Sequence, residues 1–230
     1  MKAKKETTHF IFYYQKDSTA ERGIELIAKV SEESFSKIVK TLKLKKDFPK
    51  IKYFLYETNE DKLRATGDEG NANTNRVKFE IHAVYNDEVK AVGPHEIVHL
   101  LTNHLGVPSY VLSEGLAESF EDYWTNETNG ELRRLNHDDW VKEFLNTKKY
   151  IPIVNLFDDS RFWDYDDTIS YPESGSFVKY LIKTYGVDKI LGLYKDIKRK
   201  DSVQKDLSTF RKIIGKELTE VEKDWLRNLN

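Results

Sequence analysis

The chain has 230 residues, enough for one well-buried domain or two modest lobes. Its 37 basic and 39 acidic residues give a formal net charge of -2, so no global positive field would attract nucleic acid or an anionic membrane surface. There is no cysteine, which excludes disulfides, thiolate metal ligands and a cysteine nucleophile. Any metal ion must therefore be held by histidine and carboxylate side chains.

The N-terminal residues 1–14 contain lysines but no apolar core followed by a small-residue cleavage site. No window approaches the roughly 18 consecutive apolar residues that a transmembrane helix needs. We therefore expect no membrane span and no nucleic-acid partner. The compartment and the oligomeric state stay open; we lean toward a secreted or cell-envelope bacterial protein whose signal is absent from this chain.

Three segments in the first part of the chain have the apolar pattern of β-strands: His9–Tyr14, Ile51–Glu57 and Arg76–Tyr85. Apolar residues at helical spacing over Ala20–Leu44 predict an amphipathic helix between the first two strands. The glycine and asparagine content of Thr66–Asn75 predicts a loop. In the third strand these side chains are expected to point inward: Val77, Phe79 and Ile81. Together the elements predict a small sheet with a covering helix.

From Pro94 onward, helical periodicity replaces the strand pattern. The predicted helices are separated by breaks that start at Gly106, Thr125, Phe157, Tyr185 and Ile214. The sequence therefore predicts an α+β fold in a single domain over residues 1–230. Residues 1–105 would form an α/β lobe and residues 106–230 a mainly helical lobe.

The segment His95–His99 reads HEIVH and follows Pro94, which suits the first turn of a helix because its missing N–H costs nothing there. Residues four apart in a helix lie on one face, so His95 and His99 would point toward a shared position. Glu96 lies about 100° further round the helix, where it can reach a water molecule on a metal held by the histidines. This spacing is typical of a zinc site with a glutamate general base.

A catalytic zinc ion needs a third protein ligand. Gly106 should end the first helix, and a second helix over Ser109–Trp124 should run back beside it. This places Glu114 next to the histidines as the third ligand, and Glu118 one turn later, where it can accept the outer N–H of a ligating histidine. His104 points away from the pair and is not expected to be a ligand. The alternative is a chance HExxH on a surface helix, against which the Glu114–Glu118 spacing argues.

HEIVH followed by LSEGLAESFE resembles the gluzincin metallopeptidases, the clan that includes thermolysin and aminopeptidase N, and is most similar to its smaller peptidase MA-like members. The resemblance implies a zincin-like fold in a single catalytic domain, with one Zn2+ per chain bound by His95, His99 and Glu114. It implies that Glu96 is the general base and that Glu118 supports a zinc-bound histidine. The expected reaction is hydrolysis of a peptide bond, in a peptide or protein substrate, by zinc-bound water.

Weaker similarity continues downstream. Tyr171–Gly186 resembles a later helix of the clan that a tyrosine enters, which implies that Tyr171 donates its phenolic proton to the oxyanion; a packed tyrosine is the alternative. Phe210–Leu229 resembles the closing helices. By its order along the chain, Arg76–Tyr85 resembles the strand that pairs with extended substrate, unless it is purely structural. No GxMEN motif precedes His95, which argues against aminopeptidase activity.

Two alternatives to a peptidase stay open. One is a non-catalytic, zinc-stabilised binding module of the same fold. The other is a zinc hydrolase that acts on a non-peptide amide or ester. His82 and His137 are unassigned and are treated as surface or core histidines. The acidic and aromatic segment Asp158–Asp167 either rims a cleft or forms an exposed loop.

Overall fold

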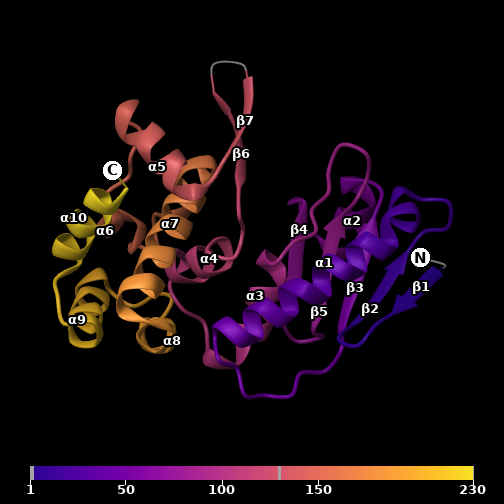
Figure 1. Cartoon of the computed structure of the whole chain (residues 1–230), viewed down its shortest axis with the longest axis horizontal. Coiled ribbons are helices and arrows are strands. Elements are labelled where there is room, and N and C mark those ends of the chain that lie inside the picture. Colours follow the sequence, from indigo (N-terminus) through magenta and orange to yellow (C-terminus); the bar gives the residue numbers. More distant parts are fainter. Residues whose placement is uncertain (1–2, 129–130, 230) are drawn as a thin grey trace. The chain divides into compact units, whose positions relative to one another are not determined.

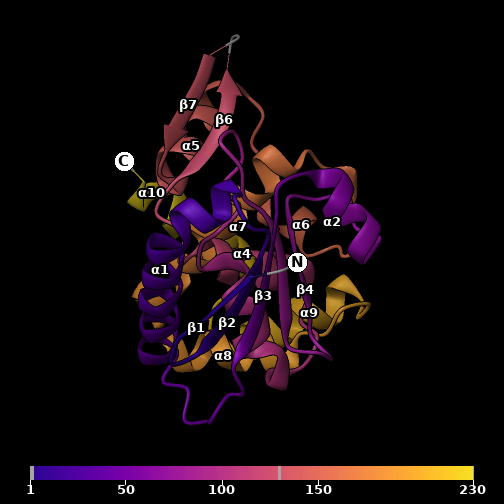
Figure 2. The same ribbon diagram turned by 90° about the vertical axis from the view of Figure 1, so that its right-hand side faces the viewer.

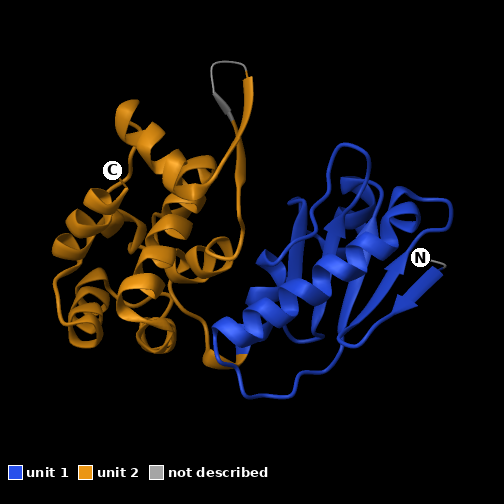
Figure 3. Cartoon of the chain, in the orientation of Figure 1, with its two compact units in different colours: residues 1–103 blue, residues 104–230 orange. Residues whose placement is uncertain are grey.

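The computed structural model describes residues 3–128 and 131–229. Helices and a small mixed sheet are combined in the chain, which confirms the predicted α+β class (Figure 1). The chain divides into two compact units, Met1–Asn103 and His104–Asn230 (Figure 3). Among the described helices, none has both the length and the apolar character needed to cross a membrane.

The first unit is built on a five-stranded sheet with the order β1-β2-β3-β5-β4. Its strands are β1 (Ala3–Glu6), β2 (Phe10–Tyr14), β3 (Ile51–Tyr56), β4 (Ala72–Asn75) and β5 (Glu80–Val84). The strands β2, β3 and β5 are parallel, whereas β1 and β4 pair antiparallel with their neighbours and form the two edges. The parallel strands hold the core of the sheet, where Phe10, Phe12 and Tyr53 are fully buried.

The helices of this unit are α1 (Thr19–Thr41), α2 (Asn59–Thr66) and α3 (His95–Thr102). α1 and α2 lie on opposite faces of the sheet (Figure 2). The side chain of Ser18 caps α1 by accepting a hydrogen bond from the backbone N–H of Glu21. Phe35 of α1 packs edge-on against Phe10 of β2, with ring centroids 6.1 Å apart. The predicted helix over Ala20–Leu44 is thus confirmed, together with the first two predicted strands.

The third predicted strand, Arg76–Tyr85, is only partly right. β5 begins at Glu80, because the preceding residues form a turn in which Phe79 has a positive φ of 57°. Val77 is 96% exposed instead of pointing inward. Residues 72–75, predicted to be part of a loop, form β4.

The position of β5 also corrects its expected role. β5 lies between β3 and β4, so both of its edges are paired within the sheet. The expectation that Arg76–Tyr85 pairs with extended substrate is therefore wrong. In the described sheet, the edge on this side belongs to β4.

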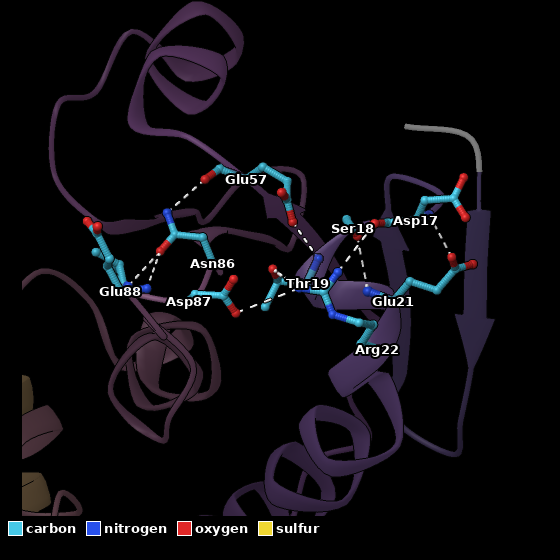
Figure 4. A network of polar contacts seen from close by, with 10 residues as sticks. Asp17, Ser18, Thr19, Glu21, Arg22, Glu57, Asn86, Asp87 and Glu88 are labelled. Atoms are coloured by element: carbon cyan, nitrogen blue, oxygen red, sulfur yellow. Dashed lines mark hydrogen bonds and ion pairs between the residues drawn. The ribbon is translucent and has the colours of Figure 1, made fainter.

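A polar network joins the loops that follow the three parallel strands (Figure 4). Glu57, after β3, accepts the backbone N–H of Thr19 at 2.6 Å through its carboxylate. The backbone oxygen of Glu57 accepts a hydrogen bond from the Asn86 side chain, after β5, at 2.8 Å. Arg22 of α1 and Asp87 form an exposed ion pair at 3.7 Å. These contacts hold the start of α1 at the carboxyl ends of the strands.

The second unit is mainly helical. Its helices are α4 (Tyr110–Glu118), α5 (His137–Asn146), α6 (Ile153–Leu156), α7 (Asp167–Tyr185), α8 (Val187–Asp196), α9 (Val203–Ile214) and α10 (Leu218–Asn228). Short 3-10 helices span Asn103–Leu105 (η1) and Phe162–Asp164 (η2). The predicted breaks at Tyr185 and Ile214 mark the ends of α7 and α9, each followed by a glycine with positive φ, Gly186 and Gly215.

An antiparallel hairpin interrupts the helices, with strands β6 (Trp124–Thr128) and β7 (Glu131–Leu135). The predicted helix over Ser109–Trp124 therefore ends early, at Glu118. The predicted break over 125–130 falls in this hairpin, and its last two residues, 129–130, lie outside the described residues.

Two glycines allow α4 and α7 to approach closely. A Cβ atom on Gly115 would lie 2.6 Å from the backbone oxygen of Ser174, and a Cβ atom on Gly175 would lie 2.6 Å from Cβ of Glu118. Non-bonded carbon atoms are at their best separation at about 3.5–4.0 Å, so neither position has room for a side chain unless the helices move apart. The contact fixes α4 against the centre of the second unit.

Candidate metal centre

The helix α3 carries the predicted histidine pair. Its apolar residues are buried at 0–1% exposure: Ile97, Val98, Leu100 and Leu101. In the first unit α3 packs against α1, β4 and β5. Pro94 is the N-cap residue, directly before the first helical residue. His95 and Glu96 are half-buried at the start of the helix, whereas His99 is only 6% exposed.

The rings of His95 and His99 meet through their Nε2 atoms, which lie 3.1 Å apart. The ring planes are nearly perpendicular, at 79°. Two nitrogen atoms bound at about 2.0–2.1 Å to one tetrahedral zinc ion lie about 3.3 Å from each other. The distance between these donor atoms is close to the one that a shared metal ion would need, and it also fits a hydrogen bond between the two rings.

Glu114 lies on α4 and is 7% exposed. The first turn of α4 is held by Asp159, whose carboxylate accepts the backbone N–H of Tyr110 at 2.7 Å. One ligand atom from each of His95, His99 and Glu114 lies within 4.8 Å of the other two. The three side chains that the sequence nominates as ligands thus form a group that could hold a metal ion.

Glu118 contacts a histidine that the sequence leaves unassigned. Its Oε2 atom lies 2.8 Å from Nε2 of His137, and the two side chains are 2% and 1% exposed. The expectation that Glu118 supports a zinc-bound histidine stays a prediction. The place of His137 in the buried stripe of α5, with Trp140 and Phe144, is the signal that could have found it.

Tyr171 lies in the second turn of α7 rather than at its entrance, because the helix starts at Asp167. Its ring is part of an aromatic cluster, with centroid distances of 5.7 Å to Trp124, 6.4 Å to Phe162 and 6.3 Å to Trp163. The segment Asp158–Asp167 supplies two of these rings. The role of Tyr171 as an oxyanion donor stays a prediction.

The other histidines considered from the sequence lie elsewhere. His82 is buried in the sheet, with Nδ1 2.9 Å from the Tyr56 hydroxyl and Nε2 3.6 Å from the Glu80 carboxylate. Burial lowers the pKa of His82. His104 is exposed in η1 and is not among the grouped ligands.

A cavity of about 790 Å³ is present in the first unit, at the carboxyl ends of β2 and β3. Its lining includes Lys16, Tyr56, Asp61 and Arg64. None of the predicted metal-site residues is among the residues that line it. Cavity size alone therefore does not identify the candidate centre, which is defined by its donor atoms.

The donor set of two histidines and one glutamate is one that catalytic zinc sites use, with a fourth position left for water or substrate. It contains no thiolate, as a chain without cysteine requires. Comparison with known proteins adds no family to this picture, since no family model matches the chain and no curated protein matches it.

Proposed function

We propose that the chain is a zinc-dependent peptidase of the gluzincin type with a zincin-like fold. The observation that carries the proposal is the grouping of His95, His99 and Glu114 within 4.8 Å. The histidines would hold Zn2+ through Nε2 and Glu114 through a carboxylate oxygen. When bound, a zinc ion lowers the pKa of water and polarises a substrate carbonyl.

Glu96 is the proposed general base. It lies in the first turn of α3, half-buried, about 100° round the helix axis from His95. From this position its carboxylate can take a proton from the attacking water and return it to the leaving amine. The neighbouring ligand His95 keeps Glu96 beside the centre, while the rotation around the helix keeps it out of the ligand set.

The edge strand β4 supports a peptide as the substrate. α3 packs beside β4 within the first unit, and β4 is the last strand of the described sheet on that side. An extended peptide can add to such an edge through main-chain hydrogen bonds, largely independent of its sequence. A peptide on β4 would lie along the same unit that carries His95, Glu96 and His99.

Substitutions can separate the base from the ligands. Glu96→Gln should retain about one zinc ion per chain and slow hydrolysis of a broad peptide library by roughly 100-fold or more. Glu69→Gln, in an exposed loop, is the matched control and should change neither property. His99→Gln should lose zinc, whereas His104→Gln should keep it. If Glu96→Gln cleaves the library as fast as the wild type, the proposed mechanism is wrong.

The two alternative functions share these residues and are separated by what the protein binds and cleaves. A chain that holds no tightly bound zinc after reconstitution would be a metal-free binding module. A chain that holds zinc but hydrolyses neither peptides nor other amides and esters would be a zinc-stabilised module. A zinc-bound chain that cleaves only non-peptide amides or esters would be a hydrolase of another class.

A further inference from the structure

A second group of acidic side chains lies in the second unit and has no part in the proposed zinc centre. Asp206, in the first turn of α9, is 1% exposed, and neither of its carboxylate oxygens has a hydrogen-bond partner among the described residues. Asp201 lies just before Ser202, the N-cap of α9. Its Oδ1 atom accepts a hydrogen bond from Lys205 at 2.8 Å, whereas its Oδ2 atom is buried without such a partner.

Asp159 brings a third carboxylate to the same region. Its two oxygens accept the backbone N–H groups of Tyr110 at 2.7 Å and of Lys200 at 3.2 Å. The second of these bonds ties Asp159 to the residue directly before Asp201. Burial, and then the charges of Asp201 and Asp159, raise the pKa of the Asp206 carboxyl to about 7, because Lys205 offsets them only in part.

Buried carboxylate oxygens without donors are unfavourable unless a positive charge or a proton reaches them. At Asp206 the negative charges of Asp201 and Asp159 outweigh the positive charge of Lys205, whereas Lys205 and Lys198 offset the charge of Asp201 and Arg199 offsets part of that of Asp159. We propose that Asp206 and Asp201 bind a hard divalent cation of the Ca2+ type, with Asp159 as an additional negative charge beside it. The inference concerns the second unit and does not depend on the proposed peptidase function.

The burial of Asp206 favours Ca2+ over Mg2+. Ca2+ accepts 6–8 oxygen ligands in irregular arrangements, including backbone carbonyl and water oxygens, whereas Mg2+ usually keeps several of its waters. A carboxylate that is 1% exposed leaves little room for a retained hydration shell. The side chain of Asp201 is 19% exposed and offers the approach from solvent. Zinc is disfavoured because the group has oxygen donors and no histidine.

The test uses the full chain as purified, at about pH 8, and CaCl2 as the ligand. Calorimetric titration of the wild type should show one Ca2+ per chain. A hundredfold excess over Kd should raise the midpoint of thermal unfolding by about 5 °C or more. MgCl2 at the same concentration should give a smaller shift, and NaCl of equal ionic strength should give none.

Asp206→Asn keeps the size of the side chain and removes its charge, so it should abolish both the Ca2+ binding and the thermal shift. Asp201→Asn is a second variant and should weaken Ca2+ binding at least tenfold. Asp196→Asn, which removes an exposed charge at the end of α8, is the matched control and should bind Ca2+ as the wild type does.

Two results would overturn the proposal. One is unchanged Ca2+ binding in both Asp206→Asn and Asp201→Asn, which would place the ion elsewhere in the chain. The other is a wild type that responds to neither Ca2+ nor Mg2+, which would leave a proton as the sole partner of Asp206.

Discussion

The close approach of α4 and α7 predicts that Gly175→Ala is destabilising even though alanine is the better helix former. The new Cβ atom would meet Cβ of Glu118 at 2.6 Å and Cδ2 of His137 at 3.1 Å. Such overpacking costs about 1–3 kcal/mol, and displacing the buried Glu118–His137 pair adds about 1–3 kcal/mol. Alanine stabilises a helix by about 1 kcal/mol relative to glycine, which offsets part of this loss. We therefore expect a net loss of about 1–5 kcal/mol.

Urea unfolding of the metal-free protein, followed by tryptophan fluorescence, measures this loss without a contribution from bound ions. Gly192→Ala in α8 is the matched control, since its Cβ atom would find its nearest neighbour, Cγ2 of Ile213, at an ordinary 3.7 Å. That substitution should leave stability unchanged or raise it by up to about 1 kcal/mol. A Gly175→Ala variant within about 0.5 kcal/mol of the wild type, beside a well-behaved control, would refute the packing argument.

Three further predictions concern the metal centre, the buried pair and the acidic group. Glu114→Gln should lower zinc affinity more than about 100-fold, measured by competition with a chelator, and unchanged affinity would remove Glu114 from the ligand set. His137→Ala should lower the free energy of unfolding by about 3 kcal/mol, because it leaves Glu118 buried beside a cavity; a loss below about 1 kcal/mol in urea would contradict this. Without divalent ions, Asp206 should make stability pH-dependent. Its folded pKa of about 7 exceeds the ordinary value of 3.8, so its stabilising contribution is fully present below 3.8 and is lost as the pH rises through 7. The total is about 4 kcal/mol, and Asp206→Asn should flatten the pH profile of urea midpoints; an equally steep profile in that variant would assign the titration to other groups.

The candidate histidine pair was predictable because its geometry is local. Residues four apart in a helix share a face whatever surrounds the helix, so HEIVH could be interpreted before any tertiary contact was known. The helix break at Gly106 was predictable for the same reason, since a glycine with a positive φ acts on the chain locally. The start of α4 depends on a tertiary contact instead, because Ser109 makes no side-chain cap hydrogen bond and Asp159 accepts the backbone N–H of Tyr110. His137 was not predictable as the partner of Glu118, because that contact joins α4 to α5 across the hairpin.

In the sheet, the sequence pattern predicts some strands wrongly and misses others. Residues Arg76–Phe79 are apolar at alternate positions, yet they form a turn in which the Asn75 side chain accepts the backbone N–H of Lys78 at 3.1 Å. The edge strands β1 and β4 and the hairpin β6–β7 are short and polar, so they carry no apolar alternation to reveal them. Their strand conformation depends on pairing with neighbours, which single-sequence patterns do not contain.

The polar character of those edges has a consequence for how copies of the chain meet one another. A long apolar edge strand would offer its unpaired backbone groups to a second sheet and promote aggregation. β1 carries Lys4, Lys5 and Glu6 over four residues, and β4 carries Asn73 and Asn75 over four residues. The charged residues of β1, and the short polar sequences of both edge strands, disfavour pairing between the sheets of two copies of the chain. The edge of β4, where the proposed peptide substrate would pair, is therefore a poor template for self-association.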